Sequence, residues 1–265
     1  MTENVTAPET AEAVVPTTAE GVKSAEEVAY FAGFDFGTLE VTLENLLKAG
    51  VHFGHLKSRR HPKMDEYIFT TRKNINILDL EKTAAKLETA SAFLTEVVKS
   101  GKPVLFVGVK KQTHDSVKSL AERIGMPYVI DRWLGGTLTN FSHIKSRAKY
   151  LVETEEKLAR GEFKKYTKFE QAKKNEEIER LEKRMGGIKT LDMIPGAIVI
   201  ADTREADIVI HEARKLSVPI VGIVDSNTDP SFVDYPIPGN DDAVSSLRMV
   251  LGALGKAVLK AKEGK

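Results

Sequence analysis

The chain has 265 residues, of which 42% are hydrophobic and 29% charged, with a net charge of +1, which is the balance of an ordinary globular protein. It contains no cysteine, which excludes disulfides, thiolate zinc sites and cysteine nucleophiles. No apolar run approaches the roughly 18 to 20 residues of a membrane span and no signal-peptide pattern opens the chain, so we expect a cytoplasmic protein without a membrane partner.

The net charge conceals an asymmetry between the two parts of the chain. Residues 1–40 carry eight acidic side chains and one basic side chain, a net charge of −7, so residues 41–265 carry +8. The first 21 residues mix Ala, Thr, Glu and Pro without periodicity, which is typical of disorder. We therefore predict an acidic, mostly disordered extension over residues 1–38 and a basic α/β domain over residues 39–265 that suits a polyanion.

The domain alternates between helical periodicity and short runs that are apolar on both faces. Thr42 and Gly50 bound a first helix, and the stretch "VHFGHLKSRRHPKM" after it is interpreted as a turn with structural histidines. Strands that are apolar on both faces and alternate with helices predict a doubly wound parallel sheet covered on each side. The expected strands are 103–109, 127–130, 197–202 and 219–225, and the expected helices are 79–101, 114–125, 204–217 and 241–261.

One segment breaks this alternation. Residues 140–185 are highly charged and have two narrow apolar seams at helical spacing, and Thr167 with Glu170 forms a capping box for the second helix. We predict an antiparallel helical hairpin, a coiled coil, inserted over residues 139–187. It has 13 basic and nine acidic side chains, a net charge of +4, which suits either a solvated coiled coil or a surface for phosphate.

The sequence offers no assembled catalytic constellation. A single glycine, Gly108, lies where a dinucleotide fold needs three, so we interpret it as a close-packing position and disfavour a nucleotide cofactor. No serine lies in a nucleophile elbow, and Asp241 and Asp242 are interpreted as helix caps. We expect no enzymatic activity and no required cofactor.

A metal site remains an alternative in one place. Asp202 and Asp225 each end an apolar strand, so both carboxylates are expected at the same edge of a parallel sheet, where ligands gather. His55 can join them around a divalent ion that is structural in role. The commoner outcome for such residues is a hydrogen-bonded loop histidine and strand-end caps.

Basic side chains recur in the early loop, after the strand at 103–109 and around the glycine-rich segment "DRWLGGTLTN". An arginine beside an aromatic ring on a loop suits phosphate contact and base stacking. The alternative for Trp133 is a core anchor beside the Gly135 and Gly136 turn. The candidate RNA-binding residues are Lys57, Arg59, Arg60, Lys63, Arg72, Lys73, Lys110, Lys111, Arg132, Trp133, Asn140, Lys145 and Arg147.

Nine spaced motifs together resemble the bacterial form of the small-subunit ribosomal protein S2 family, over roughly Val41 to Leu259. So many motifs in one order are far more specific than a single glycine pattern. The acidic extension before Thr38 is longer than the family usually has. In chain order the motifs are "AGVHFGH", "PKM", "INILDLEKT", "LFVGVKKQ", "RWLGGTLTN", "GGIK", "IPGAIVIAD", "PIVGIVDSNTDP" and "IPGNDDA".

The resemblance implies a flavodoxin-like α/β domain with an inserted helical hairpin. It also implies a structural role in translation: the protein would lie between head and body of the small ribosomal subunit, bind small-subunit ribosomal RNA, contact neighbouring ribosomal proteins and help dock protein S1, without forming homo-oligomers. Two rivals stay open on the residues alone. One is an α/β enzyme that uses a metal at His55, Asp202 and Asp225, and the other is a protein-docking scaffold.

Overall fold

The computed structural model describes residue 36 and residues 39–264. The predicted acidic extension therefore lies outside the described residues, apart from Phe36, which packs into the core. No helix in the described part of the chain is long and apolar enough to cross a bilayer.

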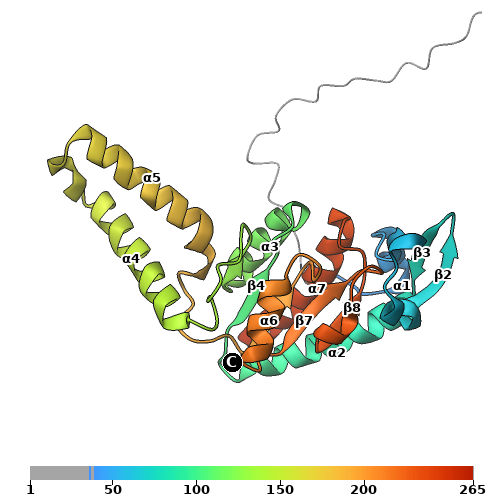
Figure 1. The fold of residues 1–265 in the computed structure, drawn as a ribbon. Coiled ribbons are helices and arrows are strands. Elements are labelled where there is room, and N and C mark those ends of the chain that lie inside the picture. The colour runs from blue at the N-terminus through green and yellow to red at the C-terminus, as the bar shows by residue number, and fades with distance from the viewer. Residues whose placement is uncertain (1–35, 37–38, 265) are drawn as a thin grey trace, which may run out of the picture.

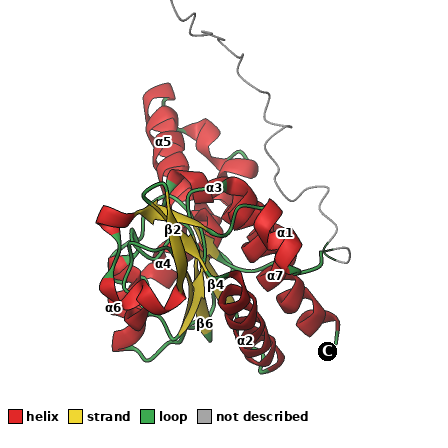
Figure 2. Cartoon of the chain, turned by 90° about the vertical axis from the view of Figure 1, so that its right-hand side faces the viewer, coloured by secondary structure: helices red, strands yellow, loops and turns green. Residues whose placement is uncertain are grey.

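A five-stranded parallel sheet forms the centre of the molecule (Figures 1 and 2). Its spatial order is β5-β4-β6-β7-β8, which is the 2-1-3-4-5 order of flavodoxin-like folds. The fold-class prediction is confirmed, although β8 was not predicted because "YPIP" has two prolines, which suit only an edge strand. The strands are β4 (Val104–Val107), β5 (Tyr128–Val129), β6 (Ala197–Ile200), β7 (Ile220–Val224) and β8 (Tyr235–Pro238).

Alternate residues of the sheet enter two separate cores. Phe106 and Val199 lie in the core covered by α2, α3 and α7, whereas Leu105 and Ile198 lie in the core on the opposite face, with α6 and the base of α4. Both faces are buried, which explains why the strands are apolar throughout. The helices are α2 (Leu80–Lys99), α3 (Lys111–Ile124), α6 (Asp207–Lys215) and α7 (Val244–Glu263), and a 3-10 turn, η6 (Pro230–Phe232), precedes β8.

A second, three-stranded antiparallel sheet occupies the region between α1 (Leu43–Lys48) and α2, with the order β1-β3-β2. The interpretation of "VHFGHLKSRRHPKM" as a turn was wrong, because this stretch contains β1, a short strand whose irregular register hides the alternation of period two. Thr42 caps α1 as predicted. The elements are β1 (Phe53–Leu56), η2 (Lys57–Arg59), η3 (Pro62–Tyr67), β2 (Ile68–Arg72) and β3 (Ile75–Leu78).

Two long helices, α4 (Phe141–Ala159) and α5 (Lys168–Met185), extend to one side of the sheet, opposite the small sheet (Figure 1). A 3-10 turn, η4 (Glu162–Lys165), joins them, and the predicted capping box of Thr167 and Glu170 is present. A second 3-10 turn, η5 (Gly186–Ile188), follows α5. A Cβ at Gly187 would lie 2.3 Å from the carbonyl oxygen of Tyr128, so this glycine allows the returning chain to approach β5.

Candidate functional site

Exposed basic side chains converge at one end of the small sheet. The chain leaves β1 into η2, where the amide of Lys57 donates to the carbonyl oxygen of Asn74 at 2.8 Å, so η2 lies against the turn between β2 and β3. Both residues of that turn have positive φ, 48° at Lys73 and 66° at Asn74, which is the type I′ geometry that a two-residue hairpin favours. We call the exposed bases there the basic end: Lys57, Arg59, Arg72 and Lys73.

Two further bases of the same loop are engaged within the protein. Arg60 forms an ion pair with Asp65, and the ammonium of Lys63 lies 2.8 Å from Asp229 Oδ2. Partial burial of Asp229 would raise the pKa of its carboxyl, but hydrogen bonds from Lys63 and Ser231 outweigh burial and lower that pKa to about 2. Lys63 and Arg60 are therefore less available to an external phosphate than the basic end.

The glycine-rich loop is organised by a buried carboxylate that the sequence analysis missed. Glu212 on α6 is 8% exposed, and five donors from the loop point at its two oxygens. Burial alone would raise the pKa of Glu212, but these hydrogen bonds outweigh burial and lower it. The donors are the Trp133 indole (3.1 Å), the amides of Gly136 (2.7 Å), Leu138 (3.0 Å) and Thr139 (3.1 Å), and the Thr139 hydroxyl (3.2 Å).

The structure favours the core-anchor alternative for Trp133. Its side chain is 5% exposed and lies in the core beneath α6, so its ring faces offer no platform for stacking. Arg132, Asn140 and Arg147 are exposed around the start of α4, as is Lys111 at the start of α3. Lys145 is also exposed, and its ammonium lies 3.3 Å from Asp192 Oδ1. The loop thus presents bases at the surface while its tryptophan fixes the backbone behind them.

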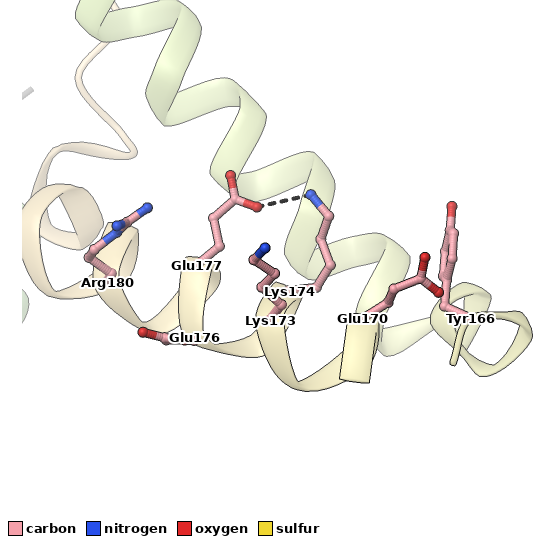
Figure 3. Close-up of a pocket in the computed structure, with 7 residues that line it drawn as sticks. All are labelled: Tyr166, Glu170, Lys173, Lys174, Glu176, Glu177 and Arg180. Atoms are coloured by element: carbon pink, nitrogen blue, oxygen red, sulfur yellow. Dashed lines mark hydrogen bonds and ion pairs between the residues drawn. The ribbon is translucent and has the colours of Figure 1, made fainter. Parts of the chain in front are cut away.

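Further bases line a hollow along α5 (Figure 3). Lys174 and Glu177 pair at 2.9 Å, and both reach Tyr150 of α4, which ties the two helices together. Lys173 and Arg180 point from the same helix without an ion pair to the other residues drawn (Figure 3). The hollow has both charge signs, so it is a weaker candidate for phosphate than the basic end.

The predicted metal-site residues lie near the carboxyl edge of the large sheet, but the described residues whose ligand atoms come within 4.8 Å of one another are His55, Asp241 and Asp242, without Asp202 or Asp225. Asp202 follows β6, Asp225 follows β7, and His55 of β1 places Nε2 3.8 Å from Asp225 Oδ2. This cluster also includes Asp241 and Lys110, which were not predicted to join it: Lys110 Nζ lies 2.8 Å from Asp241 Oδ1 and 2.8 Å from Asp242 Oδ1. Lys110 is therefore turned into the protein and away from external phosphate.

The interpretation of Asp241 and Asp242 as helix caps was wrong. Ala243 occupies the N-cap position of α7 without a side-chain cap, and Asn240 Oδ1 accepts the amides of Asp242 and Ala243 instead. Burial, and then the nearby carboxylate of Asp241, raises the pKa of both Asp202 and Asp225. The predicted close packing at Gly108 is confirmed, because a Cβ there would lie 2.7 Å from Thr113 Oγ1 and Val117 Cγ2.

Comparisons with known proteins identify the family of the chain. The small ribosomal subunit protein uS2 of Roseiflexus castenholzii (strain DSM 13941 / HLO8) is 48% identical over 222 residues, which are 84% of this chain and 84% of that protein. The protein of the same description from Roseiflexus sp. (strain RS-1) is 46% identical over 222 residues, 84% and 85% of the two chains. The family model described as ribosomal protein S2 matches residues 46–261. The chain therefore belongs to the ribosomal protein S2 family.

Proposed function

We propose that the chain is a structural constituent of the small ribosomal subunit and binds small-subunit ribosomal RNA through the basic end. The relatives are described as small ribosomal subunit proteins, and the family is one of structural components and not of enzymes. The observation that supports RNA binding most directly is the convergence of Lys57, Arg59, Arg72 and Lys73 at one exposed end of a small sheet.

Phosphate recognition explains why such a surface suits RNA. Each base that neutralises a phosphate releases a bound counterion, so affinity rises with the number of exposed bases and falls with salt. Flexible, exposed lysine and arginine side chains suit backbone contacts, which position a protein on RNA without reading its sequence. Arg132, Asn140 and Arg147 at the start of α4 form a second exposed group that extends the surface we propose for RNA.

The finer placement rests on the resemblance to the family. We propose that the chain lies between head and body of the subunit, contacts neighbouring ribosomal proteins and helps dock protein S1. Exposed apolar side chains on β2 and α1 offer a surface of the right chemistry for a protein partner, since Phe69 is 75% exposed, Leu47 is 54% exposed and Leu43 is 47% exposed.

The basic end can be tested by removing three charges at once. We expect Lys57→Ala, Arg59→Ala and Lys73→Ala together to weaken incorporation into small subunits and to lower the slope of log affinity against log salt by about 3, roughly 1 for each base. The slope is measured with purified small-subunit ribosomal RNA by filter binding over a salt series.

A matched control removes the same charge from another surface. Lys86, Lys99 and Lys102 are exposed on and after α2, so their replacement by alanine should leave both slope and incorporation unchanged. An equal loss in the two triple variants would show a general effect of net charge and would refute the assignment to the basic end.

A further inference from the structure

The cluster at the carboxyl edge of the large sheet has more negative charge than its partners balance. Asp202, Asp225 and Asp241 are 2%, 1% and 1% exposed, and Asp242 lies beside them. Even with Asp242 half exposed, the single ammonium of Lys110 cannot balance all four carboxylates in their ionised form. Uncompensated buried charge is costly, so such a cluster needs a positive partner or protons.

A second observation points to a ligand. Asp225 Oδ2 is buried and accepts no hydrogen bond from any described residue, although it lies 3.8 Å from His55 Nε2. Asp202 Oδ2 is likewise buried without a partner in the described part of the chain. Buried oxygens of this kind are rare in folded proteins and call for a specific explanation.

We propose that the cluster is a divalent metal site in which His55 Nδ1, Asp241 and Asp242 bind the ion. One ligand atom from each of these residues lies within 4.8 Å of the others, and His55 Nδ1 is 3.7 Å from Asp242 Oδ2. Ligand atoms about 2.1 Å from one ion are separated by roughly 3 to 4.2 Å, so small side-chain movements complete the site.

The second nitrogen of His55 fits the same arrangement. A metal-binding histidine usually donates its other ring N–H to a carboxylate, which fixes the ring orientation. Here Nε2 faces Asp225 Oδ2, so Asp225 is a positioning residue, and its unpartnered oxygen gains a donor once the ring is fixed.

The donor set indicates the class of ion. Carboxylates suit hard ions and imidazole suits transition metals, so one imidazole with two carboxylates favours Zn²⁺ or Mn²⁺ over Mg²⁺ and Ca²⁺. Lys110 contacts Oδ1 of both aspartates, whereas Asp242 Oδ2 faces His55 and is the Asp242 oxygen that we assign to the ion. The site lies at the carboxyl ends of the parallel strands, since Asp225 follows β7 and Asp241 follows β8, and ligands of open α/β sheets bind at this edge.

The test is metal binding by the full chain, stripped with a chelator, dialysed and titrated with ZnCl₂ and MnCl₂ by calorimetry. We expect saturation at about one ion per chain and a higher Tm with either metal than without. His55→Gln removes a ligand and Asp225→Asn removes the positioning carboxylate, so each should weaken binding by roughly 10- to 100-fold.

His143→Gln is the matched control, since His143 is exposed on α4, far along the chain from the cluster, and this variant should bind as the wild type does. Circular dichroism of every variant establishes that it is folded. If the folded wild type takes up no metal saturably, the proposal is overturned. It is also overturned if the folded His55→Gln and Asp242→Asn variants both bind metal as tightly as the wild type. RNA binding is measured separately, so either result leaves the proposed ribosomal function untouched.

Discussion

Glu212 shows how much one buried side chain can organise. It lies on α6, more than 70 residues after the glycine-rich loop, and it accepts hydrogen bonds from the backbone amides of that loop. These hydrogen bonds link the loop to the core. A carboxylate that accepts hydrogen bonds from several backbone amides is strongly stabilised in its charged form. The exposed bases that flank this loop, such as Arg132, therefore depend on Glu212 for their position.

We expect Glu212→Gln to lower the free energy of unfolding by about 2 kcal/mol or more, because an amide supplies a donor where the loop already presents donors. The pKa of Glu212 is lowered in the folded protein, so its contribution is complete above the ordinary glutamate pKa of about 4.3 and is lost as the pH falls through the folded-state value. The difference between variant and wild type should therefore shrink in acid.

Urea unfolding followed by the fluorescence of Trp133, the single tryptophan, measures this difference directly. Glu88→Gln on the exposed surface of α2 is the control and should leave stability unchanged. A Glu212→Gln protein as stable as the wild type near neutral pH would show that the loop does not depend on this carboxylate.

At this scale the sequence predicted the residues whose position follows from a strand end. Asp202 and Asp225 were expected at one sheet edge, and they lie there because β6 and β7 are parallel neighbours. Two contacts were not predicted, because they join distant positions and leave no local pattern in the sequence. Lys110 and Asp241 are 131 residues apart, and Glu212 is about 75 residues from the loop that donates to it.

Among the elements, the turn between β2 and β3 combines a structural role with the role that we propose for Lys73 in RNA binding. Both of its residues have positive φ, and an L-residue other than glycine pays about 1 kcal/mol for that conformation. We expect Asn74→Gly to raise the free energy of unfolding by a few tenths to about 1 kcal/mol and to leave the salt slope of RNA binding unchanged.

Lys73→Asn is the complementary change, because asparagine tolerates positive φ and has no charge. It should keep the turn and lower the salt slope by roughly 1. Chemical denaturation and filter binding on the two variants separate the roles. A reduced slope in Asn74→Gly, or an unchanged slope in Lys73→Asn, would contradict the placement of Lys73 on RNA.

The elements differ in how clearly the sequence predicts them. The parallel strands are short continuous apolar runs between amphipathic helices, and all four that were expected are present. The small antiparallel sheet escaped prediction because its strands are partly exposed and shift register, so neither face is consistently apolar. The basic end depends on that sheet, and its convergence could not be predicted from charge spacing alone.

At the scale of the whole molecule, the small sheet that carries the basic end lies on one side of the large sheet, and the α4 and α5 pair lies on the opposite side (Figure 1). The net charge of the whole chain, +1, suggests no affinity for RNA. Residues 41–265, however, carry a net charge of +8. The proposed RNA contact, spread over separate exposed groups, predicts binding that weakens steadily with salt.

The most direct test of the ribosomal role is sucrose-gradient sedimentation of a lysate at moderate and high salt, with the chain followed by mass spectrometry. We predict that it migrates with small subunits and remains there at moderate salt. A chain that stays at the top of the gradient under both conditions would contradict its role as a constituent of the small subunit.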